Sequence, residues 1–217
     1  MLSEIALGSL RNIMSPKINA RTTSEQREWR REQLLSVALE LALESPSHEI
    51  SMSTLAKRAG LSRTSVYEYF SSSSDVITHV LIQELEEYER ILTAAIEGTE
   101  AVTDRVRAWI EASLRYVTSG DHLLARGMGS ITTNQATVAL FRSKHQALLA
   151  PLAQVFTELG VTDTHRALVY TQAVVEIAAK NIERIDQNLI DKAEVAEREI
   201  EIAVDLVLTS LAALQRA

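Results

Sequence analysis

Apolar residues recur every three to four positions along most of this 217-residue chain, the spacing that places them on one face of an α-helix. The first such stretch, residues 22–44, begins with Thr22 and Glu25 at the spacing of a capping box. Ser45 and Pro46 then end it. Its buried face is predicted to hold Trp29, Leu34, Val37, Ala38 and Leu41.

Two short helices are predicted next, joined by a tight turn. Ser51 is placed to cap a helix over residues 52–59. Gly60 follows directly, at the position where a left-handed backbone is easiest for glycine. Ser62 caps the second short helix, whose inward residues are Val66 and Phe70.

A polar joint of four serines separates these helices from a long helix over residues 75–97. Five more helices are predicted after it, with Thr162 capping the fourth and Asp191 opening the last, over residues 103–118, 121–126, 134–159, 163–187 and 192–215. We therefore expect an all-α fold of about nine helices.

The pattern also predicts how the chain is divided. Residues 1–21 have no clear cap or partner and are expected to form a mobile N-terminal arm. Residues 22–74 are expected to form a three-helix head, and residues 75–217 a larger helical body.

Charge is distributed unevenly along the chain, whose formal net charge is −7. Residues 1–70 hold nine Lys and Arg against eight Asp and Glu, whereas residues 71–217 hold thirteen against twenty-one. Only the N-terminal third is therefore expected to face nucleic-acid phosphates, and the acidic body would be repelled by them.

Composition narrows the class of protein further. The chain has no Cys, which rules out disulfides and thiolate metal sites and fits a cytoplasmic protein. No run of eighteen apolar residues is present, so we expect no membrane span. The five histidines lack metal-ligand spacing, and no phosphate loop or nucleophile elbow occurs. We accordingly expect no metal, no cofactor and no enzymatic activity.

The second short helix carries outward side chains that suit DNA. In a helix-turn-helix, the second helix presents its first residues to base edges while flanking groups contact phosphates. Arg63 can make two hydrogen bonds to a guanine, worth about 1–3 kcal/mol of discrimination. Thr64 and Ser65 suit base edges or phosphates, and Tyr67 and Tyr69 place hydroxyl groups where the DNA backbone would pass.

The sequence LAKRAGLS at residues 55–62, followed by VYEYF at residues 66–70, resembles the DNA-binding head of the TetR (tetracycline repressor-like) family. The RxxLLxVA pattern at residues 31–38 fits the same family, and the resemblance covers residues 27–82. It implies a homodimeric transcriptional regulator that binds a double-stranded DNA operator. Such a protein is usually a repressor that a small-molecule ligand releases from DNA.

The resemblance also implies roles for individual residues. Arg63, Thr64, Ser65 and Tyr67 match the family's DNA-contacting positions, and Ser53 matches an outward site on the first short helix that often reads a base.

Three positions depart from the family pattern: Ser73 stands where a Lys is usual, Thr64 where Gly is common, and Glu68 places an acid on the DNA-facing side. A second interpretation therefore stays open, a helical ligand-binding or protein-interaction module whose helix-turn-helix no longer reads DNA.

The last two helices are the expected interface between two copies, because two such helices from each chain would make a four-helix bundle. The apolar stripe expected on the first of them holds Leu168, Gln172, Val175, Ala179 and Ile182. The stripe expected on the second holds Ile200, Ala203, Val207, Ser210, Leu211 and Leu214. The alternative is that both stripes serve the core of one chain.

Ligand contacts in the body are harder to predict, because a helical core would use most large side chains in any case. The candidates are Trp109, Tyr116, His122, Met128, Phe141, His145, Tyr170 and Glu176. Glu176 lies in an apolar run and could face a cationic ligand, but Lys180 four residues later favours a simple helix ion pair.

Overall fold

The computed structural model describes residues 23–45, 50–119, 135–185 and 189–215; between residues 135 and 146 the only side chain that it describes is Lys144. All regular structure in these ranges is helical, which confirms the all-α prediction. The helices are α2 (Thr23–Glu44), α3 (Met52–Arg58), α4 (Arg63–Tyr67), α5 (Ser73–Glu97), α6 (Val102–Thr118), α7 (Gln135–Glu158), α8 (Thr164–Glu183) and α9 (Lys192–Leu214).

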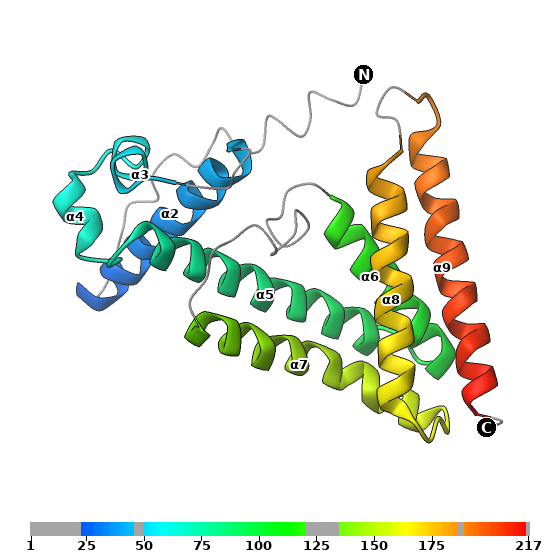
Figure 1. Cartoon of the computed structure of the whole chain (residues 1–217). Coiled ribbons are helices and arrows are strands. Elements are labelled where there is room, and N and C mark those ends of the chain that lie inside the picture. Colours follow the sequence, from blue (N-terminus) through cyan, green and yellow to red (C-terminus); the bar gives the residue numbers. More distant parts are fainter. Residues whose placement is uncertain (1–22, 46–49, 120–134, 186–188, 216–217) are drawn as a thin grey trace.

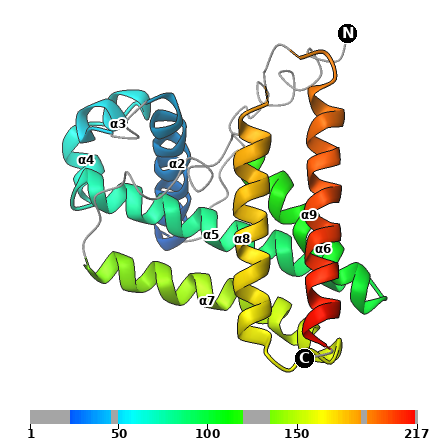
Figure 2. The same cartoon turned by 45° about the vertical axis from the view of Figure 1, so that its right-hand side comes forward.

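The helices are arranged in an elongated body with a small head at one end. In Figure 1 the helices α2, α3 and α4 form that head on the left, and α8 and α9 stand side by side on the right. Helix α5 runs from the head into the body, where α6 and α7 pack against it (Figures 1 and 2). A displacement of α5 would therefore move the head relative to α8 and α9.

A compact apolar core holds the three helices of the head together. Five apolar side chains of the head are almost fully buried: Leu34 and Ala38 of α2, Leu55 of α3, Val66 of α4, and Phe70, which follows α4. Each large apolar side chain buried in this way contributes about 1.5–3 kcal/mol. Trp29, predicted to lie on the buried face of α2, is instead 37% exposed. It lies more than one turn before Leu34, beyond the end of this core.

Three serines cap the helices of this region. The side chains of Ser51 and Ser62 accept hydrogen bonds from the backbone N–H groups of Thr54 and Ser65, both at 3.0 Å, as predicted. Ser72 caps α5 in the same way, so that this helix begins at Ser73, two residues before the predicted start at residue 75.

One predicted cap in the body is wrong, and the other residue opens its helix as predicted. Asp163, not Thr162, caps α8, since its carboxylate accepts from the backbone N–H of Arg166 at 3.0 Å. Asp191 precedes α9 but makes no side-chain capping bond. Thr22, the arm over residues 1–21 and the short helix expected over residues 121–126 lie outside the described residues.

The start of α5 is joined closely to the head. The Asp75 carboxylate accepts from the backbone N–H and the hydroxyl of Ser71 at 2.8 and 2.9 Å. The His79 ring meets the edge of Phe70 at 5.6 Å between centroids, and the Arg31 guanidinium lies 5.4 Å from the Phe70 ring centre. Phe70 therefore contacts both α2 and α5, which couples α5 to the head.

The apolar stripe expected to join two copies through α9 lies mostly inside one chain. Ile200, Ala203, Val207 and Leu211 are buried in the core of the body, where α9 packs on α6 and α8. A second apolar row points away from that core, with Ile202 at 47% and Leu206 at 55% exposure on α9. On α8 the exposed apolar side chains are Val169, Tyr170 and Ile177.

Gly60 adopts a φ of 68°, the left-handed region in which a side chain is strained although nothing lies within 4 Å of an added Cβ. Gly60→Ala is therefore expected to lower the free energy of unfolding by about 1–2 kcal/mol. Gly60→Asn is the matched control and should cost less, because Asn tolerates this backbone better. Denaturant unfolding of the three proteins measures the difference; equal stability of all three would contradict the expectation.

Candidate DNA interface and ligand-binding body

Helix α4 has five residues; its inner side packs on the core of the head and its outer side is exposed. Val66 is 0% exposed and Phe70 is 1% exposed, so the inner side of this segment is anchored in the head core. Arg63, Thr64 and Tyr67 are exposed on the outer side. Three of the six predicted DNA-contacting side chains therefore lie together on the exposed side of an anchored helix.

Arg63 and Tyr67 form a pair on this outer surface. The Arg63 guanidinium donates to the Tyr67 hydroxyl at 3.1 Å, and its central carbon lies 5.5 Å from the centre of the Tyr67 ring. Stacking of this kind limits the conformations of a long side chain before any ligand is bound. Tyr67 thus presents Arg63 in a preferred orientation at the start of α4.

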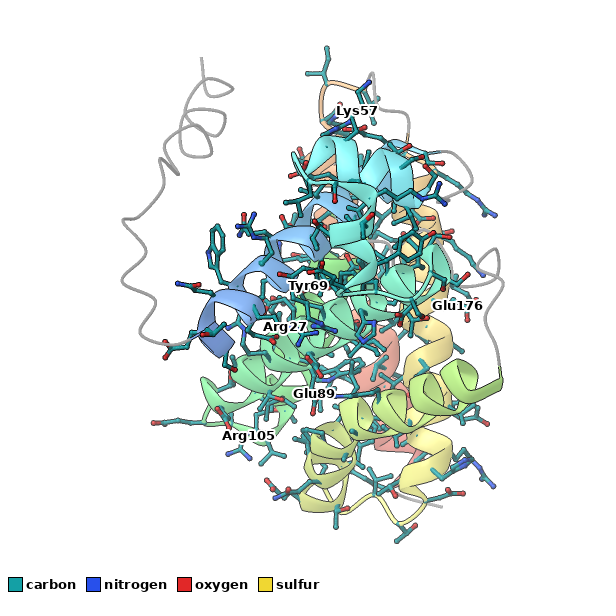
Figure 3. The ribbon with its side chains drawn as sticks, turned by 90° about the vertical axis from the view of Figure 1, so that its left-hand side faces the viewer. Arg27, Lys57, Tyr69, Glu89, Arg105 and Glu176 are labelled. Carbon is teal, nitrogen blue, oxygen red and sulfur yellow. The ribbon has the colours of Figure 1, made fainter. Side chains whose placement is uncertain are left out.

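The other predicted contact residues are partly used within the head itself. The hydroxyl of Ser65 lies 2.9 Å from that of Ser62, and the hydroxyl of Ser53 lies 2.9 Å from that of Ser51. Tyr69 is half-buried, with the guanidinium of Arg27 5.9 Å from its ring centre. Figure 3 shows Arg27 and Tyr69 next to one another at the base of the head.

Arg27 also supports α4 from its C-terminal side, since it donates to the backbone carbonyl of Glu68 at 3.2 Å. Glu68 itself is exposed and leaves an acidic side chain at the end of α4. Arg27 is a positioning residue that the sequence reasoning missed. Its helical position alone gave no signal that its side chain crosses from α2 to α4.

Two basic side chains near α4 differ in whether they are already paired with an acidic group. Arg58 makes a two-point ion pair with Glu44, at 3.1 and 2.8 Å, and this contact lowers the pKa of the Glu44 carboxyl. Lys57 is exposed on the last turn of α3 and was not predicted as a contact (labelled in Figure 3). Its place in the basic LAKR sequence was the available signal.

In the body, a polar layer lies between α5 and α6. Tyr88 and Tyr116 stack with 4.5 Å between ring centroids, and the Tyr88 hydroxyl is hydrogen-bonded to the hydroxyl of Ser113. The Tyr116 hydroxyl donates to the backbone carbonyl of Glu84 at 3.0 Å. Glu84 and Ser113 are buried polar side chains that were not predicted as ligand contacts. The available signal was that each is a polar residue within an apolar stripe of its helix.

Burial raises the pKa of both tyrosines in this layer. For Tyr88 desolvation is the main cause, opposed by the hydrogen bond from Ser113. For Tyr116 desolvation is again the main cause, and the negative charge of Glu84 raises its pKa further. Both effects favour the neutral phenol over the phenolate.

The remaining candidate ligand residues are scattered. Trp109 is 2% exposed, and its indole N–H has no hydrogen-bond partner among the described residues. Tyr170 is 48% exposed on α8, and Glu176 forms the expected ion pair with Lys180 at 2.5 Å on the surface. His122 and Met128, and the side chains of Phe141 and His145, lie outside what the structure describes.

The part of the chain that the structure describes contains no cluster of three or more metal-ligating side chains. Among the described helices, none is long and apolar enough to cross a membrane.

A capped pair of short helices, with basic and hydroxyl groups on the outer face of the second, defines the head as a helix-turn-helix. Residues 34–79 match the family model described as bacterial regulatory proteins, tetR family. The TetR resemblance of the head is thereby confirmed over residues 34–79.

One curated relative is the HTH-type transcriptional activator FasR of Mycolicibacterium smegmatis, which is 30% identical over 99 residues. These residues are 46% of this chain, and they span only 45% of the length of the relative.

Solved structures share the fold at low identity. The fatty acid degradation regulator FadR of Bacillus halodurans has a TM-score of 0.66 at 14% identity, over 81% of this chain and 94% of its own. FadR of Bacillus subtilis, solved in complex with stearoyl-CoA, has a TM-score of 0.65 at 16% identity, over 80% of this chain and 97% of its own. These likenesses show that the helical body shares its fold with these solved structures.

The raised pKa values of Tyr88 and Tyr116 predict how stability depends on alkaline pH. An unfolded tyrosine loses its proton near pH 10, before either buried phenol does. The contribution of these two phenols to stability is therefore complete below about pH 10 and is lost as the pH rises further. Phenolate absorbance, followed beside helix content through an alkaline titration, should show Tyr88 and Tyr116 ionising together with unfolding. Ionisation of Tyr88 and Tyr116 while the protein stays folded would contradict this.

Proposed function

We propose that this chain is a homodimeric transcriptional regulator that binds an operator in double-stranded DNA and responds to a small-molecule ligand. Residues 22–74 act as the DNA-binding unit and residues 75–217 as the ligand-binding and dimerisation unit. The observation that carries the proposal is the outer face of α4, where Arg63, Thr64 and Tyr67 are exposed above the buried Val66 and Phe70.

The chemistry of this face suits sequence reading. Arg63 is the side chain able to bond a guanine edge at two points, while Thr64 and Tyr67 suit bases or phosphates. Lys57 on α3 supplies a nearby positive charge for the DNA backbone. The acidic body discourages other orientations by repulsion.

Dimerisation follows from the small size of the head and from the exposed row on α8 and α9. One helix-turn-helix reads too few base pairs, so two copies bind the two halves of a palindromic operator. The outward apolar row of Ile177, Ile202 and Leu206, together with Val169, is a surface that a second copy would cover. We propose this row, and not the buried stripe, as the dimer interface.

The ligand is proposed to reach the layer between α5 and α6. Trp109 offers an indole N–H without a described partner, and a buried donor of this kind is stabilised by an acceptor atom. The complex of Bacillus subtilis FadR with stearoyl-CoA supports a ligand with a long apolar chain in this fold. Movement of α5 would transmit ligand binding to the head, because Phe70 of the head contacts His79 of α5.

We propose repression as the mode of action, since a dimer bound over a promoter blocks transcription without further contacts. The curated relative is named an activator. A promoter–reporter assay with and without this gene therefore decides between repression and activation. A cytoplasmic location is proposed because the operator DNA lies there.

Replacing Arg63 by Ala is expected to weaken binding to the cognate operator about 5- to 150-fold, the equivalent of about 1–3 kcal/mol. Lys57→Ala should instead weaken binding to all sequences and reduce the salt dependence by about one phosphate contact. Fluorescence anisotropy with operator and unrelated duplexes measures both.

Arg90→Ala is the control for these two variants, because Arg90 pairs with Glu87 on the surface of the body. It should bind DNA like the wild type. Failure of the wild type to bind any DNA at low salt would sink the proposal and favour a helical ligand-binding module.

Ile177→Glu and Leu206→Glu are each expected to convert a dimer into a chain of 24.0 kDa. Both side chains are more than half exposed, so the fold should tolerate the charge while a dry interface would not. Sedimentation analysis measures the mass, and Ala94→Glu on exposed α5 surface is the control. A wild type that sediments as a single chain, or variants that stay dimeric, would exclude this interface.

A further inference from the structure

A groove of about 620 Å³ runs between α5 and α7, with α6 closing one end. Ile96, Pro151 and Val155 supply apolar surface, and the small side chains of Ala147 and Ala150 leave the groove unfilled. Helices α5 and α7 lie side by side in both Figure 1 and Figure 2. The volume is in the range of sites that hold drug-sized molecules, about 300–1,000 Å³.

A backbone carbonyl in this groove lacks its helical partner. Pro151 lies inside α7 and has no N–H, so the carbonyl of Ala147, four residues earlier, cannot make the usual i to i+4 hydrogen bond. Ala147 and Pro151 both line the groove. The wall therefore presents a hydrogen-bond acceptor beside apolar surface.

The charged groups at the groove are mostly acceptors as well. Glu97 lines it at the end of α5 and has neither an ion-pair nor a hydrogen-bond partner among the described residues. Gln154 donates to Glu158 at 3.2 Å, which leaves its own carbonyl oxygen as an acceptor. The C-terminal ends of α5 and α7 add negative character through their final carbonyls.

The one cation among the lining residues is already engaged. Arg105 donates to Glu158 at 2.8 Å, and to the carbonyl oxygens of Thr99 and Glu100 at 2.9 and 3.2 Å. These bonds tie α6 to α7 and to the turn after α5, so Arg105 serves to hold this end of the groove. Because Glu97 and Glu158 line the groove as well, its lining residues carry one more negative than positive charge.

The geometry points to a second small-molecule site in this groove, for an organic cation that joins a protonated amine to an apolar body. The apolar part packs on Ile96, Pro151 and Val155. The ammonium donates to the Ala147 carbonyl and faces the Glu97 carboxylate, a pairing of donors with acceptors that an anion could not make.

This groove site is separate from the buried layer between α5 and α6, and its occupancy can be measured without DNA. Its absence would leave the proposed operator binding unaffected, and loss of operator binding would leave the groove intact. Because α5 continues into the head, a molecule wedged between α5 and α7 also has a direct mechanical route to α4.

Calorimetric titration of the full-length protein with 4-phenylbutylamine tests the assignment. The matched alcohol, 4-phenylbutan-1-ol, and the matched anion, 4-phenylbutyrate, should bind at least about tenfold more weakly. Glu97→Gln is expected to weaken the amine about fivefold, the size of one partly exposed charge contact. Glu183→Gln on exposed α8 is the charge-matched control and should leave binding unchanged.

Two further variants locate the site. Ala150→Phe fills the groove and should abolish binding, whereas Ala94→Phe, on the exposed side of α5 outside the lining, should not. Pro151→Ala restores the missing N–H to the Ala147 carbonyl and should weaken the amine more than its trimethylammonium analogue, which has no N–H donor. Undiminished binding by Ala150→Phe, equal affinity for the carboxylate, or no binding of the amine at millimolar concentration would each overturn the assignment.

Discussion

The packing of Val66 and Phe70 beneath α4 is the interaction on which the function of this molecule depends. A helix of five residues is far below the length that is stable alone in water, so its backbone must be held by tertiary contacts. Burial of these two side chains holds it from below, the Ser62 cap holds its first turn, and Arg27 holds its last carbonyl. Only with that support do Arg63, Thr64 and Tyr67 keep a fixed geometry on the outer face of the head.

The same anchor connects α4 to the rest of the molecule through α5. Phe70 contacts His79 at the start of this helix, the polar layer of Tyr88 and Tyr116 lies near its middle, and Glu97 closes its end at the groove with α7. One 25-residue helix therefore contacts the head, the buried layer and the groove in turn. We propose that a ligand at either body site acts on the head by shifting this shared helix.

Local chemistry made much of the head predictable. Ser51 and Ser62 each precede a short helical pattern, and Gly60 stands where a left-handed backbone is needed, so the helix pair followed from a few adjacent residues. The cap of α8 was misplaced by one residue, because Thr162 and Asp163 are both good caps and the choice depends on how the chain leaves Gly160. The crossing of Arg27 from α2 to α4 could not be predicted, since it joins residues 41 positions apart.

By itself, the sequence determined the all-helical class, the helix-turn-helix and its TetR resemblance, because helical periodicity, caps and turn residues are local properties. The tertiary structure decided which face of each body helix is buried. Helix α9 has apolar residues on two sides, and only the packing on α6 and α8 shows that Val207 lies inside while Leu206 faces outward. The groove is likewise tertiary, because Ile96 and Pro151 come from helices whose approach no local pattern specifies.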